Sequence, residues 1–156
     1  SRRPIRKSCT SPQAQHNRDS GGGENGMAGG DCFCGAVRFE IRLPSKWVAH
    51  CHCSMCRRAH GAAFVTWVGS EVANATIDDP QSVLRWYASS VGAERGFCTR
   101  CGSTLFFRSE RWPGELHIVL ANFNEPVDRA PQAHVFWSAH VAWSTTDPHD
   151  ALPRKG

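Results

Sequence analysis

Seven of the eight cysteines fall into three short clusters, and these are the residues of the sequence best suited to chemistry: Cys32 and Cys34, then Cys51, Cys53 and Cys56, then Cys98 and Cys101. Grouped thiolates at such spacings are typical of zinc ligands. The last pair has the spacing of a zinc knuckle, and Gly102 directly after it suits the tight turn of that motif. We therefore expect the clusters to bind zinc.

The number of cysteines favours two zinc sites of different kinds. A closed structural site takes four protein ligands, whereas a catalytic site takes three and keeps one position open. The segment from Cys51 to Cys56 can give three thiolates to one ion, and the two remaining pairs together supply four. Spacing does not prove this division, because His50, His52 or His60 could close the second site.

Disulfide bonds and redox chemistry fit the clusters less well. The cysteines in Cys32–Cys34 and Cys51–Cys53 are too close for relaxed bridges. No βαβ pattern surrounds Cys98 and Cys101, as a redox motif of this spacing would need. Cys9 and His16 stand apart, and we expect an unliganded thiol and a solvated imidazole there.

Arg57, Arg58 and His60 follow the middle cluster and are candidate substrate contacts. The arginines could form a cationic rim that holds an anionic substrate, or they could be solvated and offset the charge of the thiolates. His60 could relay a proton or order a metal-bound water, although a single histidine of this kind is more often a supporting or surface residue.

Alternation of apolar and polar residues predicts a mainly β protein of one domain, with short antiparallel strands. The expected strands are 37–43, 64–68 (closed by Gly69), 83–87, 104–107, 117–120 and 134–137, and one short helix is expected within 53–62. The aromatic residues of this sheet are predicted to form the core: Trp67, Trp86, Phe97, Phe106 and Phe107.

Composition divides the 156 residues into two parts. Residues 1–26 are polar and aperiodic, so we expect a disordered N-terminal extension or leader before a zinc-binding domain over 27–156. The net charge of +4 belongs mostly to the first part, because residues 27–156 hold 13 basic and 12 acidic side chains. Seven thiolates on two zinc ions would make that domain net negative. We therefore expect no nucleic-acid partner.

The sequence also argues against a membrane protein. Its longest apolar stretches, such as 117–121, are far shorter than the ~20 residues that span a bilayer. The polar N-terminal stretch does not look like a secretory signal. We expect a cytoplasmic location and no membrane partner.

The three clusters, in this order, resemble the family of the glutathione-dependent formaldehyde-activating enzyme and centromere protein V. The resemblance covers about residues 29–154 and is carried by the stretches Asp31–Glu40, His50–Arg58 and Arg95–Ser103, with an ending near Leu152 and Pro153. It implies a β-tent fold of two antiparallel layers stapled by zinc. It also implies a structural zinc on Cys32, Cys34, Cys98 and Cys101, and a catalytic zinc on Cys51, Cys53 and Cys56.

The function implied by the resemblance is that of a carbon–sulfur lyase. We expect it to act on the adduct of a small, glutathione-like thiol with an aldehyde, with the substrate thiolate at the open three-cysteine site and the second zinc more labile than the first. The alternative is a module without turnover, which either binds thiols or uses structural zinc to mediate macromolecular interactions.

Overall fold

The computed structural model describes residues 26–145, 147 and 149–156. The extension predicted for residues 1–26, with Cys9 and His16, lies outside the described residues except for Gly26.

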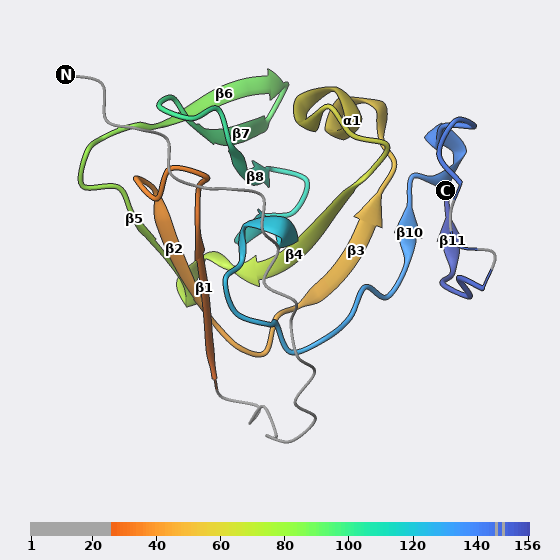
Figure 1. Ribbon diagram of the computed structural model, residues 1–156, viewed down its shortest axis with the longest axis horizontal. Coiled ribbons are helices and arrows are strands. Elements are labelled where there is room, and N and C mark those ends of the chain that lie inside the picture. Colours follow the sequence, from red (N-terminus) through yellow and green to blue (C-terminus); the bar gives the residue numbers. More distant parts are fainter. Residues whose placement is uncertain (1–25, 146, 148) are drawn as a thin grey trace, which may run out of the picture.

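The described chain is built around two β-sheets (Figure 1). The smaller sheet has the order β1 (Met27–Asp31), β2 (Arg38–Arg42), β5 (Ala75–Asp78). The larger has the order β11 (Arg154–Lys155), β10 (His134–Val135), β3 (Trp47–Cys51), β4 (Val65–Glu71), β9 (Glu115–Val119), β8 (Thr104–Ser109), β7 (Ala93–Cys98), β6 (Leu84–Ser90). The prediction of a mainly β, single-domain fold is confirmed.

The helical elements are short and connect the strands. They are the α-helix α1 (Ser54–His60) and the 3₁₀ turns η1 (Val72–Asn74), η2 (Leu120–Asn122) and η3 (Trp137–Ala139). No helix among the described residues is long and apolar enough to cross a membrane.

Strand pairing is antiparallel, as predicted, except at one edge of the larger sheet. There β10 runs parallel to both β3 and β11. The difference arises because the chain reaches β10 through the long segment after η2 and not through a hairpin, so no tight turn dictates its direction.

A hydrophobic core holds the two sheets together. Strand β2 alternates between exposed and buried residues, and its inward Phe39 and Ile41 pack with Val68, Phe106 and other core residues of the larger sheet. The rings of Phe39 and Phe106 meet edge to face with centroids 5.6 Å apart. Burial of apolar surface on this scale is the main favourable term for the fold.

The predicted helix and five of the six predicted strands correspond to elements of the structure, and the sixth strand does so only in part. The expected helix and the first five expected strands correspond to α1, β2, β4, β6, β8 and β9. Only two residues of 134–137 are strand, since η3 begins at Trp137. Of the five aromatic residues predicted as core, Trp67 and Phe106 are buried, and the other three are only partly covered.

Strand β4 does not end at Gly69, as the sequence suggested, but continues to Glu71. The glycine makes room for a neighbour: a Cβ atom at Gly69 would lie 2.3 Å from the indole of Trp47, its partner on β3. Close approach of this ring, and not a turn, explains why glycine stands there.

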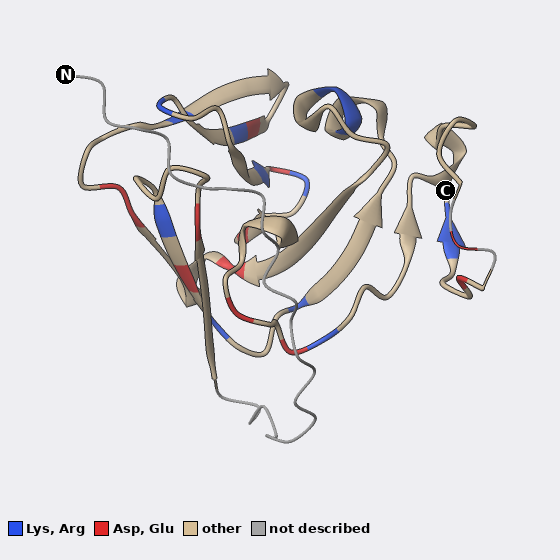
Figure 2. Ribbon diagram, in the orientation of Figure 1, with Lys and Arg blue, Asp and Glu red and all other residues tan. Residues whose placement is uncertain are grey.

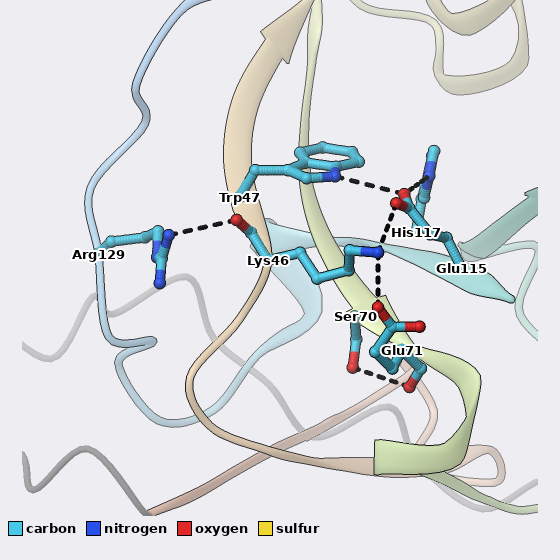
Figure 3. A network of polar contacts seen from close by, with 7 residues as sticks. All are labelled: Lys46, Trp47, Ser70, Glu71, Glu115, His117 and Arg129. Atoms are coloured by element: carbon cyan, nitrogen blue, oxygen red, sulfur yellow. Dashed lines mark hydrogen bonds and ion pairs between the residues drawn. The ribbon is translucent and has the colours of Figure 1, made fainter. Parts of the chain in front are cut away.

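A polar network spans β3, β4 and β9 at the end of the sheet away from α1 (Figure 3). Glu115 accepts hydrogen bonds from the indole Nε1 of Trp47 at 3.3 Å and from Nε2 of His117 at 3.1 Å, and its other oxygen lies 2.8 Å from the Nζ of Lys46. Lys46 also pairs with Glu71 at 2.6 Å. Burial lowers the pKa of His117, so its ring is neutral at pH 7 and donates as a neutral imidazole.

We predict that Glu115→Ala lowers the free energy of unfolding by about 1–3 kcal/mol, because buried His117 loses its acceptor. Burial opposes ionisation of Glu115, but hydrogen bonds from Lys46 and His117 outweigh it and hold its pKa below the ordinary value. Its contribution is therefore present above about pH 4.5 and declines as the pH falls further. Urea unfolding at pH 7 and pH 4 measures both effects. The control is Glu71→Ala: its side chain is 46% exposed, so the change should be below about 1 kcal/mol. Equal losses in the two variants would contradict the prediction.

Candidate metal centres

The first group of cysteines joins the two sheets. Cys32 and Cys34 lie in the turn between β1 and β2, while Cys98 ends β7 and Cys101 lies in the turn to β8. In both turns the glycine after the second cysteine bonds back to the first cysteine: the amide of Gly35 donates to the carbonyl of Cys32, and that of Gly102 donates to the carbonyl of Cys98, each at 2.8 Å.

Each turn needs its glycine, and the two turns also contact each other. Gly35 and Gly102 have φ angles of 75° and 79°, which other residues adopt at a cost. The amide of Phe33 donates to the Oγ of Ser103 at 3.0 Å. As a result, two pairs of sulfurs that are 64 residues apart in the chain face one another.

The distances within this group suit a tetrahedral metal ion. The four Sγ atoms all lie within 4.8 Å of one another, with 3.5 Å between Cys32 and Cys34 and 3.9 Å between Cys34 and Cys98. Four sulfurs about 2.3 Å from a zinc ion are about 3.8 Å apart. Cys32 and Cys98 are buried, and Cys34 is exposed. The donor set and its spacing therefore fit a closed zinc site.

The second group lies where β3 enters α1. Cys51 ends β3, Cys53 is the N-cap of α1, and Cys56 lies in the first turn of that helix. The Sγ atoms lie within 4.8 Å of one another, and those of Cys51 and Cys56 are 3.6 Å apart. Within the described part of the chain, no fourth His, Cys, Asp or Glu joins this group.

Of the histidines considered as a fourth ligand for this group, His50 and His52 have other partners, whereas the buried Nε2 of His60 makes no hydrogen bond within the described structure. Nδ1 of His50 lies 2.8 Å from the Oγ1 of Thr66, and Nε2 of His52 lies 2.8 Å from Nδ1 of His134. His60 lies on the last turn of α1, where its ring meets Trp67 edge to face. Three thiols and an unfilled fourth position fit a metal site that can take a ligand from outside the chain.

The three thiols of this group share protons unequally. Hydrogen bonds from Cys51 and Cys56 lower the pKa of Cys53. The complementary bonds to Cys53 and Cys56, together with burial, raise the pKa of Cys51. Of the three thiols, Cys53 is therefore the one that loses its proton most readily, and a metal ion would favour all three thiolates.

The three predicted substrate contacts differ in their surroundings. Nε of Arg57 donates to the carbonyl of His52 at 3.2 Å, so this arginine supports the loop of the second group. Arg58 is exposed. Burial, followed by the charge of Arg95, lowers the pKa of His60 to about 4, so its ring is neutral at pH 7.

A pocket of about 360 Å³ adjoins the second group. His60 and Phe64 line it, and its walls at Val65 and Val119 belong to the apolar cluster that also contains Cys51. The pocket is large enough for a small organic molecule, although none of the three cysteines lines it directly.

Two features around the second group were not assigned from the sequence. One is Arg95 on β7, which donates from Nη2 to the Sγ of Cys56 at 3.6 Å. The other is a chain of side chains: His52 contacts His134, and Nε2 of His134 lies 2.6 Å from the Oδ2 of Asp150. The only sequence signal for Arg95 is its position two residues after Ala93, which puts both side chains on the same, buried face of β7. The histidine chain joins residues 82 and 16 positions apart, which no local pattern reveals.

This histidine chain anchors the loop of the second group to the C-terminal segment. His52 and His134 are 3% and 1% exposed, and burial, followed by the charge of His134, lowers the pKa of His52 to about 4. The amide of His52 also donates to the carbonyl of Val135 at 3.0 Å. His134 and Val135 thus support the segment between Cys51 and Cys53, and Asp150 holds His134 in turn.

We predict that His134→Ala lowers the free energy of unfolding by about 2–4 kcal/mol, because it opens a cavity and leaves Nε2 of His52 without a partner. Denaturant unfolding measures the loss. The matched control is His140→Ala, on an exposed ring that stacks on Trp137, where we expect a change within about 0.5 kcal/mol. A loss in the control as large as that at His134 would refute the anchoring role.

Comparison with known proteins agrees with this geometry. Residues 27–139 match the family model described as "Glutathione-dependent formaldehyde-activating enzyme". A Halomonas elongata protein named "Putative glutathione-dependent formaldehyde-activating enzyme" is 29% identical over 109 residues, which is 66% of this chain and 69% of that protein. A protein of Schizosaccharomyces pombe named an uncharacterized lyase is 33% identical over 78 residues, 50% of this chain and 55% of its own length.

A solved structure shares the fold. The crystal structure of a Rhodobacter sphaeroides protein superposes with a TM-score of 0.54 and 25% sequence identity, covering 65% of this chain and 92% of that one. Together with the family match over 27–139, which includes all seven clustered cysteines, this supports a single conclusion. The chain belongs to the family of the glutathione-dependent formaldehyde-activating enzyme.

Proposed function

We propose that this protein is a zinc-dependent carbon–sulfur lyase that acts on the adduct of a small, glutathione-like thiol with an aldehyde. The observation that carries the proposal is the second cysteine group: three convergent thiols at Cys51, Cys53 and Cys56, and no fourth ligand from the described residues. The names of the relatives, an enzyme that activates formaldehyde and a lyase, agree with it.

The seven clustered cysteines would form two zinc sites with different roles. Cys32, Cys34, Cys98 and Cys101 would hold a structural zinc ion, and Cys51, Cys53 and Cys56 would hold a second. The chemistry that zinc supplies at such an open site is the deprotonation of a bound thiol and the polarisation of a carbonyl oxygen.

The chain's own residues would position and enclose the reactants. The pocket beside His60 and Phe64 would hold the organic part of the adduct away from bulk water. Exposed Arg58, two residues after Cys56 in α1, would contact a carboxylate of the thiol substrate, as glutathione has. The neutral ring of His60 would accept or return a proton near the pocket.

The reaction is balanced without a further reactant. In the direction of synthesis, the thiol sulfur bonds to the carbonyl carbon, the carbonyl π bond opens, and the thiol proton ends on the oxygen. In the direction of cleavage, the carbon–sulfur bond breaks, and the thiol and the aldehyde are released. No oxidant or reductant takes part.

Basic residues are spread over several elements of the described chain. Figure 2 shows Lys and Arg positions on α1, β2 and β11, and Asp and Glu positions on other strands and loops. A surface that attracts nucleic acid would present basic residues grouped on one face. This distribution favours a small-molecule substrate over a nucleic-acid partner.

We predict that Cys53→Ser abolishes turnover while the protein stays folded. The assay follows the S-hydroxymethyl adduct by NMR as the zinc-loaded protein is mixed with glutathione or another small thiol, with and without formaldehyde. We expect kcat/KM to fall by more than the ~10–100-fold typical of residues that only contact a ligand. The matched variant is Cys34→Ser, which removes a sulfur of the first group and should lower the melting temperature.

Three outcomes would reject the lyase. The wild-type protein could accelerate neither direction with any thiol, which would leave a binding module. The Cys53→Ser variant could keep its turnover. Finally, Cys53→Ser could lower the melting temperature as much as Cys34→Ser does, which would indicate that the second group is structural.

We also predict two zinc ions of unequal lability per chain. The site with three protein ligands is unsaturated, so a mild chelator should remove its ion before that of the four-cysteine site. Metal analysis after stepwise chelation, with a melting curve at each step, measures the effect. Loss of the first equivalent should leave the protein folded, and loss of the second should unfold it. Equal resistance of the two ions would contradict an open second site.

A further inference from the structure

Arg95 places a permanent positive charge inside the protein, next to the second cysteine group. Its side chain is on the inner face of β7, and the residue is only 6% exposed. Nη2 donates to the Sγ of Cys56 at 3.6 Å, and Cζ lies 4.9 Å from the centroid of the Phe107 ring. Sulfur on one side and an aromatic face on the other thus surround the guanidinium.

No carboxylate among the described residues balances this charge. The ion pairs found there involve Lys46, Arg108, Arg129 and two histidines, but not Arg95. Nη1 of Arg95 is buried and makes no hydrogen bond within the described structure. An arginine cannot discharge itself by losing a proton, and a buried charge without a partner costs several kcal/mol. The counter-charge must therefore come from the sulfurs.

The charges of the two sides match. Three thiolates around a divalent ion carry a net charge of −1, and the guanidinium carries +1, so the buried assembly is neutral as a whole. The four-cysteine group is different: its recorded donors to sulfur are neutral, such as the amide of Val37 to Cys32 at 3.3 Å, and Cys34 is exposed to water. Among the residues that the structure describes, the second group alone has a buried cation that donates to a sulfur.

We propose that Arg95 is the counter-ion of the three-cysteine metal site, a positioning residue that sets how tightly this site holds its metal ion. The inference rests on the metal site of the proposed function, but it does not require the lyase activity. It predicts opposite effects in the two metal states. The charge stabilises the protein when the thiolates hold a metal ion. It destabilises the protein when the ion is absent, because the thiols are then largely neutral and the guanidinium has no counter-charge.

The experiment compares Arg95→Met, Arg95→Lys and the wild type in the full chain. Methionine keeps the apolar stem without the charge, and lysine keeps the charge. The matched control is Arg108→Met, because Arg108 also stacks on an aromatic ring, Trp86 at 4.1 Å, but lies on the exposed face of β8. Competition with a chelator, using zinc and then cobalt(II) with its visible sulfur-to-metal bands, gives the affinity of each site.

We expect Arg95→Met to weaken the second site by about 10–100-fold and to leave the four-cysteine site unchanged. Arg95→Lys should stay within about tenfold of the wild type, since an ammonium keeps the charge but not the geometry. Arg108→Met should change neither site. After removal of the second ion alone, Arg95→Met should melt no lower than the wild type, whereas a residue that only fills space would lower the melting temperature in both metal states.

Several results would overturn the inference. Unchanged second-site affinity in Arg95→Met, or loss of both ions together in both Arg95 variants, would assign Arg95 a role in the fold alone. A lower melting temperature of Arg95→Met in the absence of the second ion would do the same, as would failure of that variant to fold. If the wild type binds no second ion at all, the metal site of the proposed function fails and this inference fails with it. If the wild type binds two ions and Arg95→Met holds the second ion as tightly as the wild type does, the inference alone fails.

Discussion

The structure depends on the meeting of four sulfurs at the junction of its two sheets. Cys32 and Cys34 come from the small sheet, Cys98 and Cys101 from the large one, and all four Sγ atoms lie within 4.8 Å of one another. Four thiolates at this distance repel one another, so a cation at their centre is the simplest reason for them to converge. Because Cys98 ends β7, the same junction also fixes the strand that carries Arg95.

The second cysteine group is built on a different principle. Its three sulfurs come from six consecutive residues, so the local path from β3 into α1 is sufficient to gather them. Tertiary structure adds the surroundings: Arg95 on one side, the apolar pocket with His60 on another, and the chain from His52 to Asp150 behind the loop. A rigid first site and an enclosed, electrically balanced second site are what an enzyme of this family would need.

The sequence predicted the strands whose inner and outer faces differ in polarity. Residues 37–43 alternate cleanly and form β2, and the β-branched and aromatic runs form β4, β8 and β9. It missed five strands: β1, β3, β5, β7 and β11. Strands β1 and β7 escaped because their compositions, MAGGD and AERGFC, contain glycine and charge where a strand pattern would have apolar residues. At Gly69 the sequence suggested an end, since the ring that needs the space belongs to another strand.

By itself, the sequence determined which residues are close along the chain: the clusters of cysteines, their turns with Gly35 and Gly102, and the family to which they point. Only the tertiary structure decided which pairs of sulfurs meet, which histidines are engaged elsewhere, and that Arg95 faces Cys56. The reason is physical. Ligands within one turn are brought together by local backbone geometry, whereas contacts between residues 39 or 82 positions apart depend on the order and register of strands, which the whole core sets.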